Sequence, residues 1–339
     1  MENKPIWKEY EISQLFYIEK GKGNNQKDLL VGINPYVSAT NNNNGIVFYS
    51  NDVVCHKGNS ITVSDFGQAF YQSTNFSGTH IIVLVPKFNM NKEIGIFVST
   101  CITKSVNKKY SFGYAVSSTR FAREKVLLPS KNDEPDYEYM ENFIKEIYSK
   151  KQKEMSDYIT LKLKNVSYKN IDELKNKKWK EYNIDNIFYI LPGKRLEKRN
   201  MVVGTIPFIG ASDSNNGITN YVSNINNTLD RNVLGVNYNG SVVENFYHKY
   251  KCIFSDDVKR FHLKEYIDNE YVLLFFKAII LMQKNKYKYG YKFNESRMKR
   301  QKILIPVNSK LQPDYEYMEQ FIKNIMYKKY NMMLKFLVY

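Results

Sequence analysis

The sequence predicts an α+β fold with two tandem, similar domains of mixed β-sheet and short helices, separated by two long antiparallel helices. The first observation is a repeat: residues 135–145 and 313–323 are identical except for Asn142 against Gln320. The second is that Trp7-Lys-Glu-Tyr and Trp179-Lys-Glu-Tyr open the two halves. A period this long indicates two large related halves rather than a solenoid, and we expect a pseudo-two-fold to relate them.

The repeat divides the chain into five segments. We expect a first domain at 1–134, a long helix at 135–161, a linker at 162–178, a second domain at 179–312 and a second long helix at 313–339. Pro135 and Pro313 suit a first helical turn, where a missing N–H leaves no hydrogen bond unmade. At about 1.5 Å per residue, each helix spans roughly 40 Å.

Apolar residues recur at helical spacing along both predicted long helices. We expect this stripe to be buried between the two helices, as in a coiled coil, or under a partner subunit. The residues predicted at this interface are Met140, Ile144, Ile147, Met318, Ile322 and Ile325.

The middle of each half is rich in β-branched and aromatic residues interrupted by Gly and Asn, which predicts short strands. Strands are expected at Ser60–Val63 and Ile81–Val85, with Ser241–Val243 and Cys252–Phe254 in similar places of the second half. Helices are expected at Ile94–Ser105 and Tyr271–Lys284. Apolar strands ending in Pro129 and Pro306 then precede the long helices.

The composition favours a polyanionic partner. The 339 residues carry a net charge of +16, with a pI near 9.4, and so basic a balance is typical of nucleic-acid-binding proteins. A Lys- and Asn-rich bias of the proteome remains an alternative explanation. The three cysteines show no metal-ligand spacing, and no apolar segment is long enough to span a bilayer. We therefore expect a soluble, cytoplasmic protein without membrane association.

Two Asn-rich loops are candidate base readers, because Asn can pair bidentately with adenine and hydroxyls can accept from amino groups. They align as Asn41–Gly45 and Ala211–Gly217, and the alternative is a polar turn with no partner. The candidate residues are Asn43, Asn44, Ser212, Asn215 and Asn216.

Two basic aromatic loops are candidate contacts to the DNA backbone, with lysines on phosphates and tyrosines against sugars or bases. The alternative is a solvated basic face with partly packed tyrosines. The candidates are Lys108, Lys109, Tyr110 and Tyr114 in the first half, and Lys286, Lys288, Tyr289 and Tyr291 in the second. Lys22, Lys194 and Arg195 follow glycines and are weaker phosphate-contact candidates, since no P-loop surrounds them.

No catalytic or metal-binding constellation is evident in the sequence. Asn34-Pro35-Tyr36 lacks one proline of the adenine methyltransferase motif, and the four histidines form no hydrolase pattern. A nuclease site using Asp136 with Glu173 and Lys175 would join a helix start to a linker. No glycine-rich cofactor loop is present, so we expect no cofactor in this chain.

Together these residues carry a resemblance to a known family. Two halves that open with Trp-Lys-x-Tyr-x-Ile and close with a proline-tipped strand and a long helix resemble the specificity subunit of type I restriction–modification enzymes. The Pro-Asp-Tyr-Glu-Tyr-Met phrase is also similar to specificity subunits of type IIB enzymes, which recognise split sites. The resemblance covers almost the whole chain in architecture and is weak at single residues.

The resemblance implies a DNA-binding subunit that is not itself an enzyme. Each of two target recognition domains would read one half of a bipartite, asymmetric site in double-stranded DNA, and the helices would dock methyltransferase subunits. Those subunits would bring S-adenosylmethionine, and a restriction subunit would be a further partner. Two alternatives stay open: a nuclease with an unrecognised active site, and a basic interaction module without base specificity.

Overall fold

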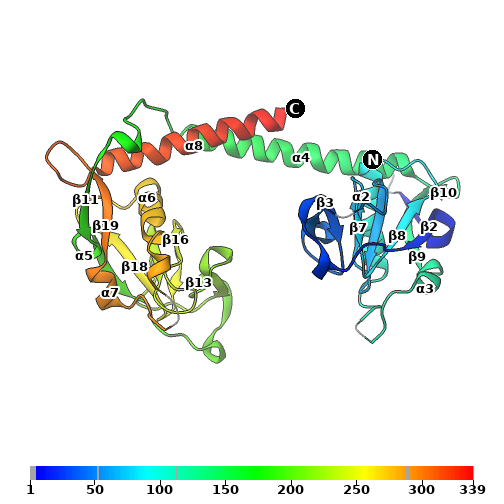
Figure 1. Cartoon of the computed structure of the whole chain (residues 1–339), viewed down its shortest axis with the longest axis horizontal. Coiled ribbons are helices and arrows are strands. Elements are labelled where there is room, and N and C mark those ends of the chain that lie inside the picture. The colour runs from blue at the N-terminus through cyan, green and yellow to red at the C-terminus, as the bar shows by residue number, and fades with distance from the viewer. Residues whose placement is uncertain (1–4, 52, 112, 288–289, 339) are drawn as a thin grey trace. The chain divides into compact units, whose positions relative to one another are not determined.

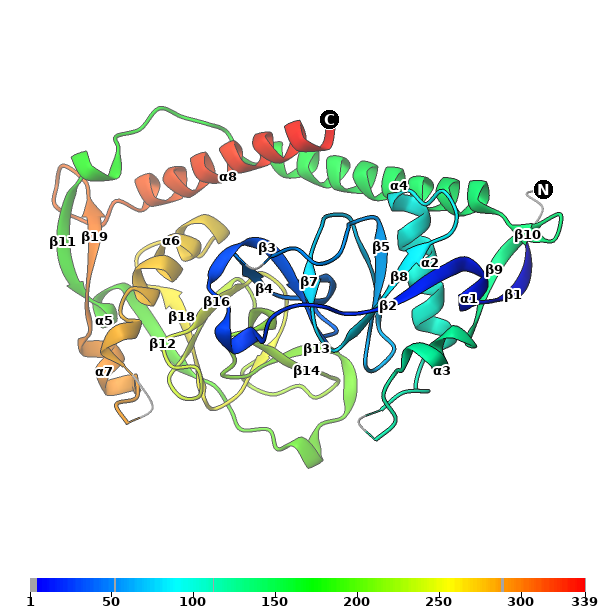
Figure 2. The same cartoon turned by 45° about the vertical axis from the view of Figure 1, so that its right-hand side comes forward.

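The computed structural model describes residues 5–51, 53–111, 113–287 and 290–338 (Figures 1 and 2). It divides into two compact units, Met1–Met155 and Ser156–Tyr339. Each unit has its own large hydrophobic core cluster. The division falls within the first long helix, α4 (Tyr137–Leu163), so that helix contributes residues to both units.

In its described residues, the first unit forms three small sheets with strand orders β2-β8-β5-β6, β4-β3-β7 and β1-β9-β10. Its strands are β1 (Ile6–Glu11), β2 (Phe16–Lys20), β3 (Val31–Val37), β4 (Ile46–Ser50), β5 (Ser60–Ser64), β6 (Ala69–Gln72), β7 (Ser77–Gly78), β8 (Ile81–Pro86), β9 (Lys125–Lys131) and β10 (Glu134–Pro135). Its shorter helices are α1 (Ile12–Leu15), α2 (Lys92–Ser105) and α3 (Ser118–Ala122).

The described part of the second unit repeats this plan with strand orders β12-β18-β15-β16, β14-β13-β17 and β11-β19. Its strands are β11 (Lys178–Asn183), β12 (Phe188–Pro192), β13 (Val203–Ile209), β14 (Ile218–Val222), β15 (Val233–Asn237), β16 (Asn245–His248), β17 (Ile253–Phe254), β18 (Val258–Leu263) and β19 (Lys302–Val307). Its helices are α5 (Ile184–Ile187), α6 (Glu270–Leu281), α7 (Glu295–Arg300) and α8 (Tyr315–Val338).

The two units match in strand pairing as well as in element order. Strand β3 is antiparallel to β4 and parallel to β7, and β13 is antiparallel to β14 and parallel to β17. A register shift also interrupts both antiparallel pairs, after Val31 and after Val203. The predicted pair of tandem α+β domains is therefore confirmed. None of the helices described here is long and apolar enough to cross a membrane.

The two long helices begin two residues later than the prolines predict. Pro135 pairs within β10, and Pro313 forms a bridge with Val307. The following aspartates provide the caps: Asp136 Oδ1 accepts from the Tyr139 N–H at 2.9 Å, and Asp314 Oδ1 accepts from the Tyr317 N–H at 3.1 Å. A side-chain acceptor at this position satisfies a backbone donor that the helix itself leaves unpaired.

Two predictions about the strands of the second unit are wrong. The strand within 252–254, β17, corresponds to β7 of the first unit, and β18 rather than β17 takes the place of β8. Residues 241–243 lie in the turn after β15, and β15 itself takes the place expected for them. Val243 has a positive φ of 70° and is fully buried, so its apolar character reflects core packing at a turn rather than a strand. Helices α3 and α7 were not predicted, because each is too short for its apolar spacing to stand out.

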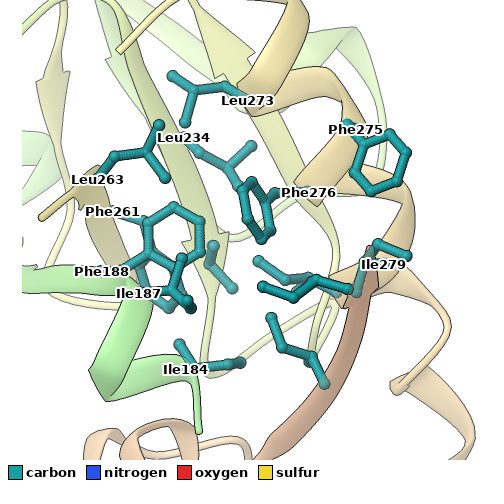
Figure 3. Packing of buried hydrophobic residues seen from close by; sticks show 14 of the residues in the cluster. Ile184, Ile187, Phe188, Leu234, Phe261, Leu263, Leu273, Phe275, Phe276 and Ile279 are labelled. Atoms are coloured by element: carbon teal, nitrogen blue, oxygen red, sulfur yellow. The ribbon is translucent and has the colours of Figure 1, made fainter. Parts of the chain in front are cut away.

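Aromatic residues from several elements pack in the core of the second unit (Figure 3). Phe188 of β12 meets Phe276 of α6 edge to face at 4.9 Å between ring centroids, and Phe261 of β18 lies 5.3 Å from Phe188. Tyr315 and Met318 of α8 belong to the same cluster. The second long helix is thus anchored in the core of its own unit.

The predicted interface stripe divides into two groups. Met140 and Ile144 lie in the core cluster of the first unit, while Met318 lies in that of the second and Ile322 packs against it. Burial within their own unit accounts for these four residues, so they need no second helix or partner subunit to cover them. Ile147 and Ile325 remain 41% and 38% exposed. Of the six stripe residues, Ile147 and Ile325 are therefore the ones left to contact a partner subunit.

A polar network distinguishes the second unit from the first. His262 Nδ1 lies 2.7 Å from Asp268 Oδ2, its Nε2 lies 2.9 Å from Asp230 Oδ2, and Arg260 Nη1 donates to the same Asp230 oxygen at 2.7 Å. With a carboxylate at each ring nitrogen, the imidazole is held as a cation. Hydrogen bonds to Asp230 and then Asp268 raise the pKa of His262 to about 9. Val85 occupies the equivalent position in the first unit, since it pairs with Tyr17 as His262 pairs with Tyr189.

The raised pKa of His262 predicts a pH-dependent stability of the second unit. The folded state binds this proton more tightly than the unfolded chain, so the stabilisation is complete below about pH 6.5 and is lost as the pH rises through about 9. We expect the melting temperature of the second unit to fall across this window. His262→Gln should be less stable at pH 6 and show a flatter profile. An unchanged alkaline profile in this variant would contradict the assignment.

Candidate nucleic-acid interface

The two Asn-rich loops form the same turn in both units. Asn43 and Asn44 have φ of 49° and 54°, and Asn215 and Asn216 have φ of 48° and 55°. The glycine that follows also has a positive φ, and its N–H donates back across the turn, from Gly45 to Asn42 O and from Gly217 to Ser214 O. Asn and Gly tolerate left-handed backbone best, which explains the residue types at these positions.

The second asparagine of each turn is held by its own unit. Asn44 Nδ2 donates to Tyr71 O at 2.9 Å, at the end of β6. Asn216 Nδ2 donates to the Tyr250 hydroxyl at 2.9 Å, just after β16. Both amides attach the turn to the sheet, which is a structural role that differs from the base contact predicted for them.

The first asparagine of each turn is better placed to contact DNA than the second. The Asn43 and Asn215 side chains are both exposed. Asn43 Nδ2 donates locally to Ile46 O at 3.0 Å, whereas the Asn215 amide makes no hydrogen bond within the part of the chain that is described. The hydroxyl of Ser212 lies 3.0 Å from that of Ser214. Base contact remains a prediction, and Asn215 is its best-placed candidate.

The candidates Lys22, Lys194 and Arg195 are all exposed. The glycine before Lys194 is required, because a Cβ at Gly193 would lie 1.8 Å from Ser255 O. An open hollow of about 790 Å³ joins Arg195 to Ala211, at the base of the Asn-rich turn. Its lining carries both signs of charge, with Arg195, Lys198, Arg199, Glu197, Asp256 and Asp257. Glu197 pairs with Arg199 at 2.7 Å and with Arg195 at 3.9 Å.

Two side chains of the first basic aromatic loop that were predicted to contact DNA bind another residue of the protein instead. Tyr110 is 6% exposed, and its hydroxyl donates to Glu124 Oε1 at 2.9 Å, so burial raises the pKa of Tyr110. Lys109 Nζ pairs with Glu124 Oε2 at 2.7 Å. Tyr110 is therefore a packing residue. Its ring is buried and cannot make the DNA contact that was predicted for it. Lys108 and Tyr114 are exposed.

The second basic aromatic loop follows the same pattern. Tyr287 takes the place of Tyr110, and its hydroxyl donates to Gln301 Oε1 at 2.7 Å. Tyr291 is 48% exposed, and Lys286 is exposed with its Nζ donating to Gln283 Oε1. Lys288 and Tyr289 lie outside the described residues.

One hairpin supports both candidate loops in each unit. In the first unit, Asn44 bonds to the end of β6, while Val116, just after the aromatic loop, donates to Asp65 O in the turn between β5 and β6. In the second, Asn216 bonds beyond the end of β16, and Lys284 pairs with Glu244 just before β16 begins. The polar turn and the aromatic loop are thus attached at opposite ends of the same strand.

Two arginines that the sequence analysis missed belong to these loops. Arg120 of α3 lies over the ring of Tyr114, and Arg297 of α7 lies over the ring of Tyr291. The available signal was an N-cap residue in both halves, Ser117 before α3 and Asn294 before α7. Ser and Asn are typical of a helix start, and an arginine follows three positions later in each half.

The structure gives the proposed nuclease residues ordinary roles. Asp136 caps α4, and Glu173 pairs with Lys175 at 2.7 Å on the surface of the other unit. The fold and these loops define a basic protein with two similar domains, each presenting one polar turn and one basic aromatic loop. This is the class of a two-domain nucleic-acid-recognition protein.

Comparison with known proteins identifies the family. The type I restriction modification DNA specificity domain matches twice, at residues 6–156 and 176–332. The chain is 42% identical over 334 residues to the specificity subunit S.BcgI of a type II restriction enzyme from Heyndrickxia coagulans, covering 95% of each chain. The type I system S subunit from M. genitalium has a similar fold, with a TM-score of 0.61, 14% identity, and coverage of 100% of this chain and 94% of that one.

The chain therefore belongs to the family of type I restriction modification DNA specificity domains, and it carries two copies. It is a specificity subunit of a restriction–modification system, and such subunits recognise DNA without being catalytic.

Proposed function

We propose that each unit reads one half of a bipartite, asymmetric site in double-stranded DNA. The observation that carries this proposal is the duplicated pairing of a polar turn and a basic aromatic loop on one hairpin. The strand between the two attachment points has four residues in each unit, so at about 3.3 Å per residue its ends lie about 13 Å apart, close to the roughly 12 Å width of the major groove. One loop can then enter the groove while the other meets the backbone.

The two half-sites should differ because the loops differ. The polar turn reads Thr-Asn-Asn-Asn-Asn-Gly in the first unit and Ser-Asp-Ser-Asn-Asn-Gly in the second. A shared scaffold with changed tips conserves the docking geometry and alters the contacts to base edges. Identity to a type II specificity subunit favours a type II system over a type I system.

We propose that α4 and α8 pack antiparallel about a pseudo-two-fold, act as a spacer and dock methyltransferase subunits. The support is apolar surface that their own units leave open, at Phe143, Ile147 and Tyr148 on α4 and at Met332 and Phe336 on α8. The methyltransferase would bring S-adenosylmethionine, and a restriction subunit would complete the system. Because the target is DNA, we expect the complex to act in the cytoplasm. A contiguous exposed apolar surface is typical of a protein-binding site.

The proposal is tested by co-expressing the chain with a methyltransferase subunit and sequencing the methylated bases of the host DNA. We expect one bipartite motif with a fixed gap, which disappears when this chain is omitted. Methylation at a continuous motif would contradict the two-reader arrangement. DNA cleavage by the isolated chain with Mg²⁺ would instead support the nuclease alternative.

Aspartate at Ile147 is expected to weaken methyltransferase docking at least about tenfold, because a charge replaces an exposed apolar contact at an interface. Lys153→Asp introduces the same residue at an exposed polar position of α4 and serves as the control. Affinity is measured by surface binding of the purified subunits. Equal losses in the two variants would point to charge repulsion rather than to an apolar dock.

A further inference from the structure

Each unit holds one arginine over the ring of the exposed tyrosine of its aromatic loop. Arg120 Cζ lies 3.9 Å from the centre of the Tyr114 ring, and Arg297 Cζ lies 3.7 Å from that of Tyr291. Each tyrosine also stacks on the inner tyrosine of its loop, with ring centroids 5.9 Å and 5.7 Å apart. The same three-part stack therefore occurs twice.

The position of each guanidinium is fixed from several sides. Arg120 Nη1 donates to Ala115 O and Arg297 Nη1 donates to Lys292 O, both at 2.7 Å. The backbone N–H of each arginine donates to the residue that caps its helix: Arg120 to Ser117 Oγ at 3.4 Å, and Arg297 to Asn294 Oδ1 at 3.0 Å. The next residue in each helix, Phe121 or Met298, is fully buried.

Among the described residues, the other N–H groups of each guanidinium have no hydrogen-bond acceptor. Throughout the described ranges, neither arginine forms an ion pair with a carboxylate. The nearest acids in sequence serve other groups: Glu124 binds Lys109 and Tyr110, and Glu295 binds Lys259 and Lys299. A planar guanidinium with free N–H groups in a fixed direction matches a phosphate, which it can bind through two parallel hydrogen bonds.

The duplication indicates what this group binds. The polar turns of the two units differ in sequence, with Thr-Asn-Asn at 40–42 and Ser-Asp-Ser at 212–214, whereas this stack is the same in both. The sugar–phosphate backbone is what two unlike half-sites have in common. We propose that Arg120 and Arg297 each clamp one backbone phosphate and so set the register of their unit on the duplex, an inference that rests on the proposed DNA-reading function.

Arginine-to-lysine variants test the clamp, because lysine keeps the charge and loses the planar fork. Arg120→Lys and Arg297→Lys are made in the full chain bound to its methyltransferase. The probes are random-sequence duplexes and duplexes enriched from that pool by the wild-type complex. We expect each variant to lose about tenfold in discrimination between the two pools while its salt dependence changes by less than one counterion.

Three controls separate the clamp from a general charge effect. Lys104→Ala removes an exposed charge outside the stack, and it should weaken binding to both pools equally. Tyr114→Leu removes the ring beneath the guanidinium and should reproduce Arg120→Lys. A single methylphosphonate in each half of an enriched duplex should weaken the wild-type complex and have no further effect on the matching lysine variant.

Two results would overturn the clamp. One is a lysine variant that discriminates as well as the wild type, and the other is a variant that changes preference at a single base pair, which would make the arginine a base reader. If the wild-type complex itself does not discriminate enriched from random DNA, the proposed DNA-reading function fails, which is a separate outcome.

Discussion

Aspartate at Met318 is expected to unfold the second unit while leaving the first unit folded. Met318 is fully buried in the core cluster that also contains Phe276 and Tyr315. Burying a charge without a partner costs about 3–5 kcal/mol, a large share of the roughly 5–15 kcal/mol that stabilises a domain. Calorimetry of the full chain should therefore show one of two transitions lost or strongly lowered.

The two units provide matched controls for this experiment. Met140 has the equivalent place in the first unit and is also fully buried, so Met140→Asp should affect the other transition. Ile325→Asp, at a residue 38% exposed, should lower the melting temperature much less than Met318→Asp. A single transition that shifts equally in both buried variants would show that the units do not fold independently.

The sequence predicts the fold well where a signal is either long or duplicated. The repeated phrase after Pro135 and Pro313 located both long helices, because a stripe of this length has a clear helical period. The strands β5, β8, β9 and β19 follow from short apolar runs between turn residues. The exact helix starts did not follow, since Pro135 is used by β10 rather than by the first helical turn.

The candidate site was predicted less completely, because side-chain direction depends on tertiary contacts. Asn43 and Asn44 look alike in sequence, yet Asn44 points its amide at Tyr71 O of β6. Tyr110 and Tyr114 also look alike, but one is buried and the other is exposed. The arginine stack brings together residues six or more positions apart in a loop and a short helix, and neither period nor composition reveals such a contact.

Glycine at Asn215 is expected to relax recognition at one base pair of one half-site. Glycine keeps the left-handed backbone of this residue, where φ is 48°, so the variant removes the side chain without straining the turn. A bidentate contact from Asn to adenine is worth about 1–3 kcal/mol, which corresponds to roughly a 5- to 150-fold loss of discrimination at that position. Competition binding with duplexes changed one base pair at a time measures this loss.

Asn43→Gly is the matching change in the first unit and should affect the other half-site alone. Asn216→Gly is the structural control: it removes the hydrogen bond to Tyr250 at 2.9 Å, so it should loosen the whole turn and weaken its half-site without preference for one base pair. If Asn215→Gly relaxed both half-sites together, the two units would not be independent readers. If it relaxed neither, the Asn-rich turn of the second unit would be only the polar turn that its sequence also allows.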